Sequence, residues 1–119
     1  MDKVNLSEKL SQFDDLWSPR VVAELNGQQV RLAKVQGEFV WHQHDDEDEF
    51  FLVIAGSLEI HLRDRIVALG VGEFFVVPRG VEHKPVSEEG AHLLLFEPEA
   101  TAHTGRVKCD RTVETFERL

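Results

Sequence analysis

The sequence predicts an all-β domain, a barrel or sandwich, with one short helix near its N-terminal end. Short apolar segments follow one another from residue 20 to residue 97. Turn-forming residues separate them about every eight to twelve residues, a spacing typical of small antiparallel β-proteins. The 119 residues fit one domain with a core of its own. We expect a single domain over 1–119, with a helical segment at 1–19, a barrel at 20–97 and a tail at 98–119.

The segment 5–13 predicts an amphipathic helix. Leu6, Leu10 and Phe13 fall on one face at helical spacing. Asn5 is placed to cap the helix, with an acidic residue three positions later as in a capping box. Because so short a helix is marginal in isolation, we expect it to dock on the barrel.

From residue 20 onwards the apolar period changes to two, which indicates strands. Asn26-Gly27 separates the first two and predicts a tight type I′ hairpin. The strands are expected, in order, at 21–25, 28–35, 38–44, 49–54, 58–63, 66–69, 73–77, 81–86 and 91–96. A last strand-like piece covers 112–116.

Composition excludes some classes of function. The chain has 13 basic and 22 acidic residues, and this net charge of −9 argues against a nucleic-acid partner. No apolar run approaches the roughly 20 residues that a membrane span needs. The first ten residues contain no apolar stretch typical of a signal peptide, so a cytoplasmic location is expected. The single cysteine, Cys109, excludes an intramolecular disulfide.

Two stretches concentrate residues that bind metals. His42 and His44 alternate on an expected strand, so both side chains point to one face. Glu49 follows five positions later, and His83 lies in a second stretch that begins at residue 72. Neutral imidazoles and a carboxylate are typical ligands of divalent metals. This combination predicts a metal site.

The two stretches together resemble the two motifs of the cupin superfamily. The first motif is filled, with one residue fewer than usual after its first glycine, by Gly37, His42, His44, Glu49 and Gly56. The second is filled by Gly72, Pro78, Gly80 and His83, with Ser87 where asparagine is usual. The resemblance implies a jelly-roll barrel, the cupin double-stranded β-helix. It also implies one divalent metal ion, of undetermined identity among Fe, Mn, Zn, Ni and Co, on His42, His44, Glu49 and His83.

The acidic run 45–49 leaves some choice of carboxylate ligand. Glu49 opens an apolar strand at the motif spacing, and Glu47 or Asp48 are its alternatives. The other carboxylates are expected at the mouth of the site, where their field favours cations. Arg79 and Lys84 are the only cations of the second motif; we expect them at the surface, although either could hold a substrate carboxylate.

Strand alternation predicts which side chains enter the barrel. If the two histidines of the first motif point inward, so do Glu38 and Val40, and Phe39 and Trp41 point outward. A second subunit would cover such an exposed aromatic pair, so a homodimer is expected. On the following strand the inward residues are Glu49, Phe51 and Val53, which predicts a mostly apolar pocket for a small-molecule ligand.

Three histidines lie outside the motifs. His61 is expected on a polar face, His92 could line the pocket, and His103 lies in the tail. No dedicated proton-transfer residue is evident beyond the ligands, so no catalytic residue is assigned.

The site indicates two classes of function. The first is a metal-dependent enzyme, of dioxygenase or isomerase type, acting on a small polar molecule. The second is a non-catalytic module that binds or senses a small molecule or a metal. More loosely, the whole chain resembles the small bacterial cupins that are often labelled as relatives of mannose-6-phosphate isomerase. We nevertheless expect no such activity, because a phosphorylated sugar would need cations inside the cavity.

Overall fold

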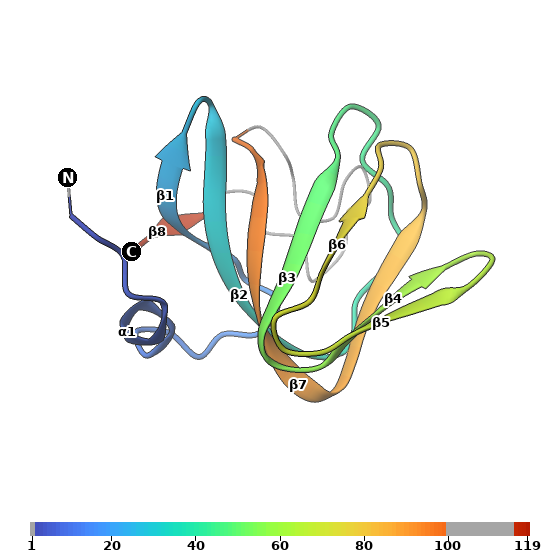
Figure 1. The fold of residues 1–119 in the computed structure, drawn as a ribbon, viewed down its shortest axis with the longest axis horizontal. Coiled ribbons are helices and arrows are strands. Elements are labelled where there is room, and N and C mark those ends of the chain that lie inside the picture. Colours follow the sequence, from blue (N-terminus) through green and yellow to red (C-terminus); the bar gives the residue numbers. More distant parts are fainter. Residues whose placement is uncertain (1, 100–115) are drawn as a thin grey trace.

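The computed structural model describes residues 2–99 and 116–119, and it is built almost entirely of strands (Figure 1). This confirms the predicted all-β fold with a short N-terminal helix. The elements are α1 (Leu6–Leu10), β1 (Arg20–Leu25), β2 (Gln28–Glu38), β3 (Glu49–Gly56), β4 (Leu58–Leu62), β5 (Ile66–Leu69), β6 (Phe74–Val77), β7 (His83–Pro98) and β8 (Glu117–Arg118). No helix in the described ranges is long and apolar enough to cross a membrane.

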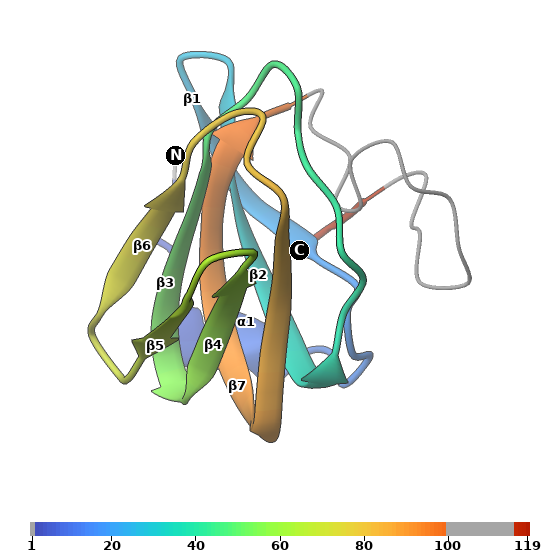
Figure 2. The same ribbon diagram turned by 90° about the vertical axis from the view of Figure 1, so that its right-hand side faces the viewer.

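The strands form one sheet in the order β5-β4-β7-β2-β1-β8, with β3 paired to β7 and β6 paired to β3. The second half of β7 lies between β2 and β3: Leu93 pairs with Ala33 on one side and Val53 on the other. The first half of β7 pairs with β4. Figure 2 shows β7 turning back on itself, so that β4 and β5 lie in front of a layer formed by β6, β3, β7 and β2.

The bend of β7 falls where a turn between two separate strands was expected. Residues 83–98 nevertheless form one strand, whose register on β2 shifts at the bend between Ser87 and Ala91. Gly90 has a φ of +102°, and its N–H donates to Ser87 Oγ at 3.1 Å. Gly56 packs against this bend so closely that a Cβ there would lie 2.1 Å from the Gly90 carbonyl oxygen. Only glycine fits at position 56, which explains the end of the first motif.

The hairpin between β1 and β2 is confirmed. Leu25 pairs with Gln28, and the two intervening residues, Asn26 and Gly27, have φ values of +50° and +76°. Positive φ at both positions is the geometry of a type I′ turn.

Helix α1 is capped as predicted but is shorter. The Asn5 side chain accepts a hydrogen bond from the Glu8 N–H at 2.9 Å. The helix ends at Leu10 rather than at residue 13. Leu10 and Phe13 nevertheless pack on Leu32, whose side chain lies on the outer face of β2. The expected docking of the helical segment is therefore present.

The expected strand 38–44 is wrong. Strand β2 ends at Glu38, and in the loop that follows only His42 forms an isolated bridge, to His83. The register of β2 on β7 shifts between Val35 and Gly37, and Gly37 has a φ of +88°. The inward parity of β2 nevertheless continues past this shift, because Ala33, Val35 and Phe39 all belong to the interior core. The parity changes after Phe39, where the chain has left the strand, so that His42 and His44 are buried as well.

Two facing predictions fail for that reason. Phe39 points inward: its residue exposure is only 7%, and its ring stacks on Trp17 with centroids 4.7 Å apart. Glu38 points outward and pairs with Lys84. Trp41 does lie toward the surface, half-buried beneath the Arg63 guanidinium, 3.8 Å from its ring centroid. Phe39 therefore has its cover within the chain and needs none from a second subunit.

A few expectations concern the C-terminal tail. Residues 112–115 of the strand-like piece, His103 and Cys109 lie outside the described residues. A strand that the sequence did not predict, β8, pairs in parallel with β1.

Candidate metal centre

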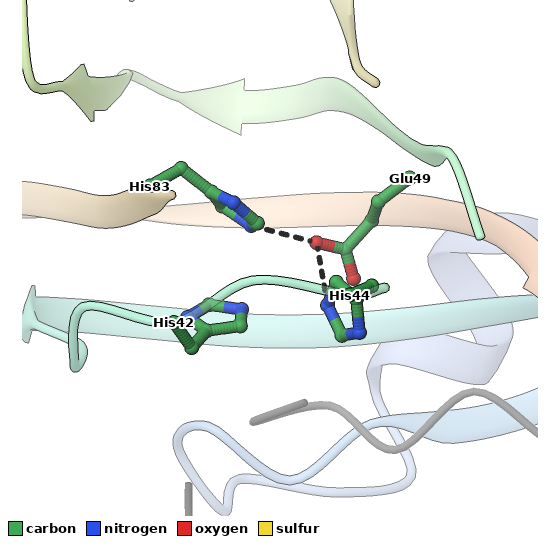
Figure 3. A group of neighbouring side chains, drawn as sticks. All are labelled: His42, His44, Glu49 and His83. Carbon is green, nitrogen blue, oxygen red and sulfur yellow. Dashed lines mark hydrogen bonds and ion pairs between the residues drawn. The ribbon is translucent and has the colours of Figure 1, made fainter. Parts of the chain in front are cut away.

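The four predicted metal ligands lie together inside the barrel (Figure 3). All four are buried, and one potential ligand atom of each lies within 4.8 Å of those of the others. His42 and His44 come from the loop between β2 and β3, Glu49 opens β3, and His83 opens β7. Glu47 and Asp48, the alternative carboxylates, are not part of this group.

Backbone hydrogen bonds join the two stretches that carry the ligands. The N–H groups of His42 and His83 each donate to the other's carbonyl, at 3.0 and 2.9 Å. The N–H of Gly80 donates to the His44 carbonyl at 2.7 Å. The second motif therefore fixes the loop that carries the first pair of histidines, although that loop is not a strand.

The ring nitrogens of two histidines are oriented by the chain. The Nδ1 atoms of His42 and His83 lie 2.9 and 3.0 Å from carbonyl oxygens two residues earlier, those of Val40 and Val81. A carbonyl can only accept, so both Nδ1 atoms carry hydrogen and donate. In a neutral ring this leaves the lone pair on Nε2, the tautomer in which such a histidine binds a metal.

The donor set fits a divalent metal. His83 Nε2 lies 3.1 Å from Glu49 Oε1, and His44 Nε2 lies 3.4 Å from the same oxygen (Figure 3). Since Nδ1 of His83 faces the Val81 carbonyl, a neutral ring would direct its Nε2 lone pair at this carboxylate, and either a second ring proton or a bound cation makes the contact favourable. Two ligands at right angles on a metal with bonds of about 2.1 Å would lie about 3 Å apart. The observed spacings match that geometry.

The protonation of the ligands also favours metal binding. Burial, with the nearby His83 adding to it, lowers the pKa of His42 from 6.5 to about 4. Burial raises the pKa of Glu49, but hydrogen bonds from His44 and His83 outweigh this and hold it well below its usual value. For His44, burial lowers the pKa, yet the Glu49 carboxylate outweighs burial and raises it. Metals bind neutral imidazole and ionised carboxylate, so His44 must give up a proton that its surroundings stabilise.

A narrow pocket of about 40 Å³ opens beside His42 and Glu49. Its remaining lining is Trp17, Pro19, Ala33, Val35, Phe39, Phe51, Pro85, Leu93 and Leu95. The expected mostly apolar wall is present, although Val53, a residue of the interior core, is not part of it. Since one water molecule needs at least about 10–15 Å³, the pocket has room for only a small ligand group.

Trp17 was not anticipated as part of this wall. It lies between α1 and β1, has a φ of +57°, and donates from its ring nitrogen to the Gln36 carbonyl at 3.0 Å. An isolated tryptophan ahead of the first strand gave no sequence signal for this position, which depends on how the N-terminal segment docks.

The remaining candidate residues lie elsewhere. His61 pairs with Glu59, and His92 is half-buried outside the metal pocket. Arg79 is exposed and pairs with Asp48. Lys84, as noted above, pairs on the surface. Within the described chain, none of these residues lines the metal pocket.

Two buried charged residues, Arg31 and Glu97, were missed. The side chains are fully buried and paired at 2.9 Å. A signal did exist, because Arg31 has the same strand parity as Ala33 and Val35, which belong to the interior core. A charge at an inward position of a strand predicts a buried partner.

Comparisons with known proteins agree with this picture. The family model described as Cupin domain matches residues 25–97. The chain is 39% identical over 64 residues to the uncharacterized protein YdbB of Bacillus subtilis, a match covering 53% of this chain and 57% of that protein. The chain thus spans little more than half of that relative.

Two solved structures are similar over most of the chain. One is a cupin-2 domain containing protein from Shewanella frigidimarina, with 49% identity, a TM-score of 0.80, and coverage of 81% of this chain and 94% of that one. The other is protein NMB1881 from Neisseria meningitidis, with 30% identity, a TM-score of 0.76, and coverage of 82% and 100%.

Proposed function

This chain belongs to the cupin-domain family, and from that premise we propose that it binds one divalent metal ion at its functional site. The ligands in this proposal are His42, His44, Glu49 and His83. In this proposal a small polar molecule in the adjoining pocket coordinates the bound metal. The protein converts this molecule as an enzyme of dioxygenase or isomerase type.

One observation carries the proposal. His83 is fully buried, its Nδ1 faces the Val81 carbonyl, and its Nε2 faces Glu49 Oε1 at 3.1 Å. Both ring nitrogens of one imidazole are therefore directed at acceptors. A neutral histidine can donate to only one of the two acceptors, so the second contact needs either a doubly protonated ring or a cation. A cation between His83 and Glu49 removes the conflict.

The metal would supply Lewis-acid polarisation of a ligand oxygen or, if it is iron, oxygen chemistry. The chain's own residues decide what reaches it. Trp17, Phe39 and Phe51 give the pocket an apolar wall, which favours a molecule that carries its polar ligating atoms on an apolar body. With about 40 Å³ available, only one or two polar atoms of that molecule can enter beside the ligands.

A second candidate function is non-catalytic binding or sensing of a small molecule or of the metal. The lining of the pocket favours it, because in the described part of the chain its only titratable residues are two of the proposed ligands, His42 and Glu49. An enzyme that moves protons commonly places a further acid or base in the pocket. An oxygen-uptake screen of the metal-loaded protein separates the two candidates.

Isomerisation of mannose 6-phosphate remains outside the proposal. Arg79 and Lys84 pair with carboxylates away from the pocket, and the buried Arg31 holds Glu97. No cation among the described residues lines the pocket, so the charge of a phosphate would find no partner there.

A homodimer and a cytoplasmic location stay as proposals from the sequence. Phe39 no longer argues for the dimer, whereas Trp41 still lies near the surface. Another apolar surface is present on β6, where Phe74 and Val76 are exposed. Light scattering of the wild type, Trp41→Glu and Phe74→Glu tests the dimer: a monomeric wild type refutes it, and a single monomeric variant identifies the face.

The proposal is tested by metal analysis of protein purified without added metal. We expect close to one ion per chain in the wild type and far less in His83→Ala, because loss of one ligand strongly weakens a four-ligand site. His61→Ala removes a histidine outside the site and serves as the matched control. Full metal occupancy in folded His83→Ala would contradict the assignment.

A further inference from the structure

Trp17 forms one wall of the metal pocket although it lies outside both metal-binding motifs. It is located between α1 and β1, and its exposed fraction is only 7%. Trp17 and Pro19 are the lining residues that come from the N-terminal segment. The other lining residues of the described chain belong to β2, β3, β7 and the loop that carries His42. The N-terminal segment therefore docks on the outer face of the barrel and also closes the space beside the ligands.

Three contacts fix the position of Trp17. Its backbone N–H donates to the Lys34 carbonyl at 2.8 Å, and its ring Nε1 donates to the Gln36 carbonyl at 3.0 Å. Its ring also stacks on Phe39, with the ring centroids 4.7 Å apart and the ring planes 15° apart. The indole is thus held by β2 at two points and by an aromatic neighbour, so the wall that it forms has a defined position.

Phe39 connects this wall to the ligands. Its ring meets the His42 ring edge-on, with the centroids 5.4 Å apart. Phe39 therefore contacts both the Trp17 ring and a proposed ligand, and all three residues line the same pocket. The position of the indole consequently determines how much space remains next to the metal centre.

The volume of the pocket limits what can lie beside the ligands. The pocket measures about 40 Å³. Since one water molecule needs at least about 10–15 Å³, this space holds at most about three or four water-sized groups. A carboxylate fits such a space, whereas a phenyl ring does not. Shortening a large buried side chain leaves a cavity that closes only partly, and an apolar cavity of this kind can take up a molecule such as benzene. Removal of the indole should therefore extend the pocket.

We propose that Trp17 is a specificity-determining residue of the metal centre: its ring closes the pocket and restricts the molecules that coordinate the metal to small ones, such as short unbranched carboxylates. A molecule with a ring attached to its coordinating group is excluded by its clash with the indole. This inference rests on the proposed metal-binding function, because it concerns what reaches the ion. It predicts that Trp17 controls selectivity between ligands.

Three variants test this role. Trp17→Ala removes the ring, and Trp17→Leu fills part of the same space with a smaller apolar side chain. Leu10→Ala is the control, because Leu10 is buried in the same N-terminal segment but packs with Phe13 and Leu32 on the outer face of the barrel. Leu10 is not part of the pocket lining, so its replacement weakens the docking of the segment and leaves the wall complete.

The measurement is the binding of formate and of benzoate to the Co²⁺-loaded protein, followed by the visible Co²⁺ spectrum. Both probes coordinate through a carboxylate, and they differ only in carrying a hydrogen or a phenyl ring. We expect the wild type and Leu10→Ala to bind formate and to discriminate equally against benzoate. In Trp17→Ala the ratio of the benzoate Kd to the formate Kd should fall by about tenfold or more, and in Trp17→Leu by less. A general loss of stability would lower the Co²⁺ content without changing this ratio.

Three results would overturn the inference. The first is an unchanged ratio in folded Trp17→Ala or, if that variant does not fold, in Trp17→Leu. The second is an equal fall in Leu10→Ala, because loosening of the segment would then explain the selectivity. The third is a Co²⁺-loaded wild type that does not bind formate, since the pocket would then give no access to the ion. Failure of the wild type to bind Co²⁺ is a different outcome: it refutes the proposed function itself, and the inference with it.

Discussion

The two ends of the barrel interior are built from the same strands but contain different chemistry. At one end β3 contributes Glu49 and β7 contributes Glu97; four residues along each strand, at the other end, the inward residues are Val53 and Leu93. The polar end consists of groups that satisfy one another or a metal. The apolar end needs no partner beyond close packing. Folding and chemistry are therefore separated along single strands, and each end should be alterable without the other.

The largest effect on stability is expected from the apolar end. Ile60 is fully buried in the interior core, so Ile60→Ala should cost about 2–5 kcal/mol of unfolding free energy through lost burial and a cavity. Urea denaturation measures it. Ile66→Ala, at a side chain that is 55% exposed, is the control and should change little. Loss of metal from folded Ile60→Ala would contradict the view that the two ends can be altered independently.

Acid should affect the polar end through His42. Its pKa in the native, metal-free protein is about 4, against 6.5 for an ordinary histidine. Between pH 6.5 and pH 4, His42 therefore binds a proton in the unfolded chain but stays neutral in the native state. The stability contribution of a neutral His42 is complete above pH 6.5, falls by about 1.4 kcal/mol per pH unit below it, and is lost at pH 4.

This acid effect is measured as a difference. The stability of the metal-free wild type relative to His42→Gln should fall between pH 6.5 and pH 4, and the NMR shifts of the His42 ring should stay those of a neutral imidazole over the same range. The subtraction matters because Glu97, whose pKa is raised, changes stability in the opposite direction as pH varies. A ring that titrates near pH 6.5 would contradict the burial argument.

Removal of the metal should have a moderate effect. At a metal concentration about 100 times Kd, binding stabilises the folded state by about 2.7 kcal/mol, so a chelator should lower the melting temperature correspondingly. Far-UV circular dichroism of the stripped protein should still be that of a folded β-protein, because the apolar end remains intact. A stripped protein that is unfolded at room temperature would make the polar end a structural site.

The smallest effect is expected outside both ends. Arg63 lies over Trp41 at 3.8 Å on the outer surface, and an exposed contact of this kind contributes about 0.5–1 kcal/mol. Arg63 also pairs with Glu82 at 3.0 Å, an exposed ion pair that contributes at most about 1 kcal/mol, so Arg63→Ala should lower stability by about 0.5–2 kcal/mol and leave metal affinity unchanged. Arg65→Ala, at an exposed neighbour, is the control. A change in metal affinity with Arg63→Ala would show that the surface and the centre are coupled.

Much of the fold and the candidate ligand cluster could be predicted because each depends on local spacing. Short stretches of sequence determine several of these features: the cap at Asn5, the Asn26-Gly27 hairpin and the alternation of the strands. The ligand residues follow the two cupin motifs. The orientation of Phe39 could not be obtained by counting back from His42, because regular alternation ends with β2 at Glu38 and the loop that carries the histidines does not keep the parity of the strand.

The missed residues depend on contacts between distant segments. The proximity of Glu97 to Glu49 requires the register of β7 on β3, which no local pattern specifies. The position of Trp17 requires the path of the N-terminal segment along β2, where the Trp17 N–H bonds to the Lys34 carbonyl at 2.8 Å. Such neighbours become evident only when the strands are assembled.

The pairing of β2 with β7 has a consequence for the order of events in folding. It joins residues as far apart in sequence as Arg31 and Glu97, 66 positions, and closing such a loop is slow relative to forming a hairpin. His42, His44 and Glu49 lie close together in the chain, but His83 reaches them only when β7 docks. We therefore expect the complete centre to form late in folding, so that a metal ion binds a barrel that is already largely folded. Bound metal should then leave the refolding rate nearly unchanged and lower the unfolding rate. It would stabilise the native state mainly by lengthening the time before the protein unfolds.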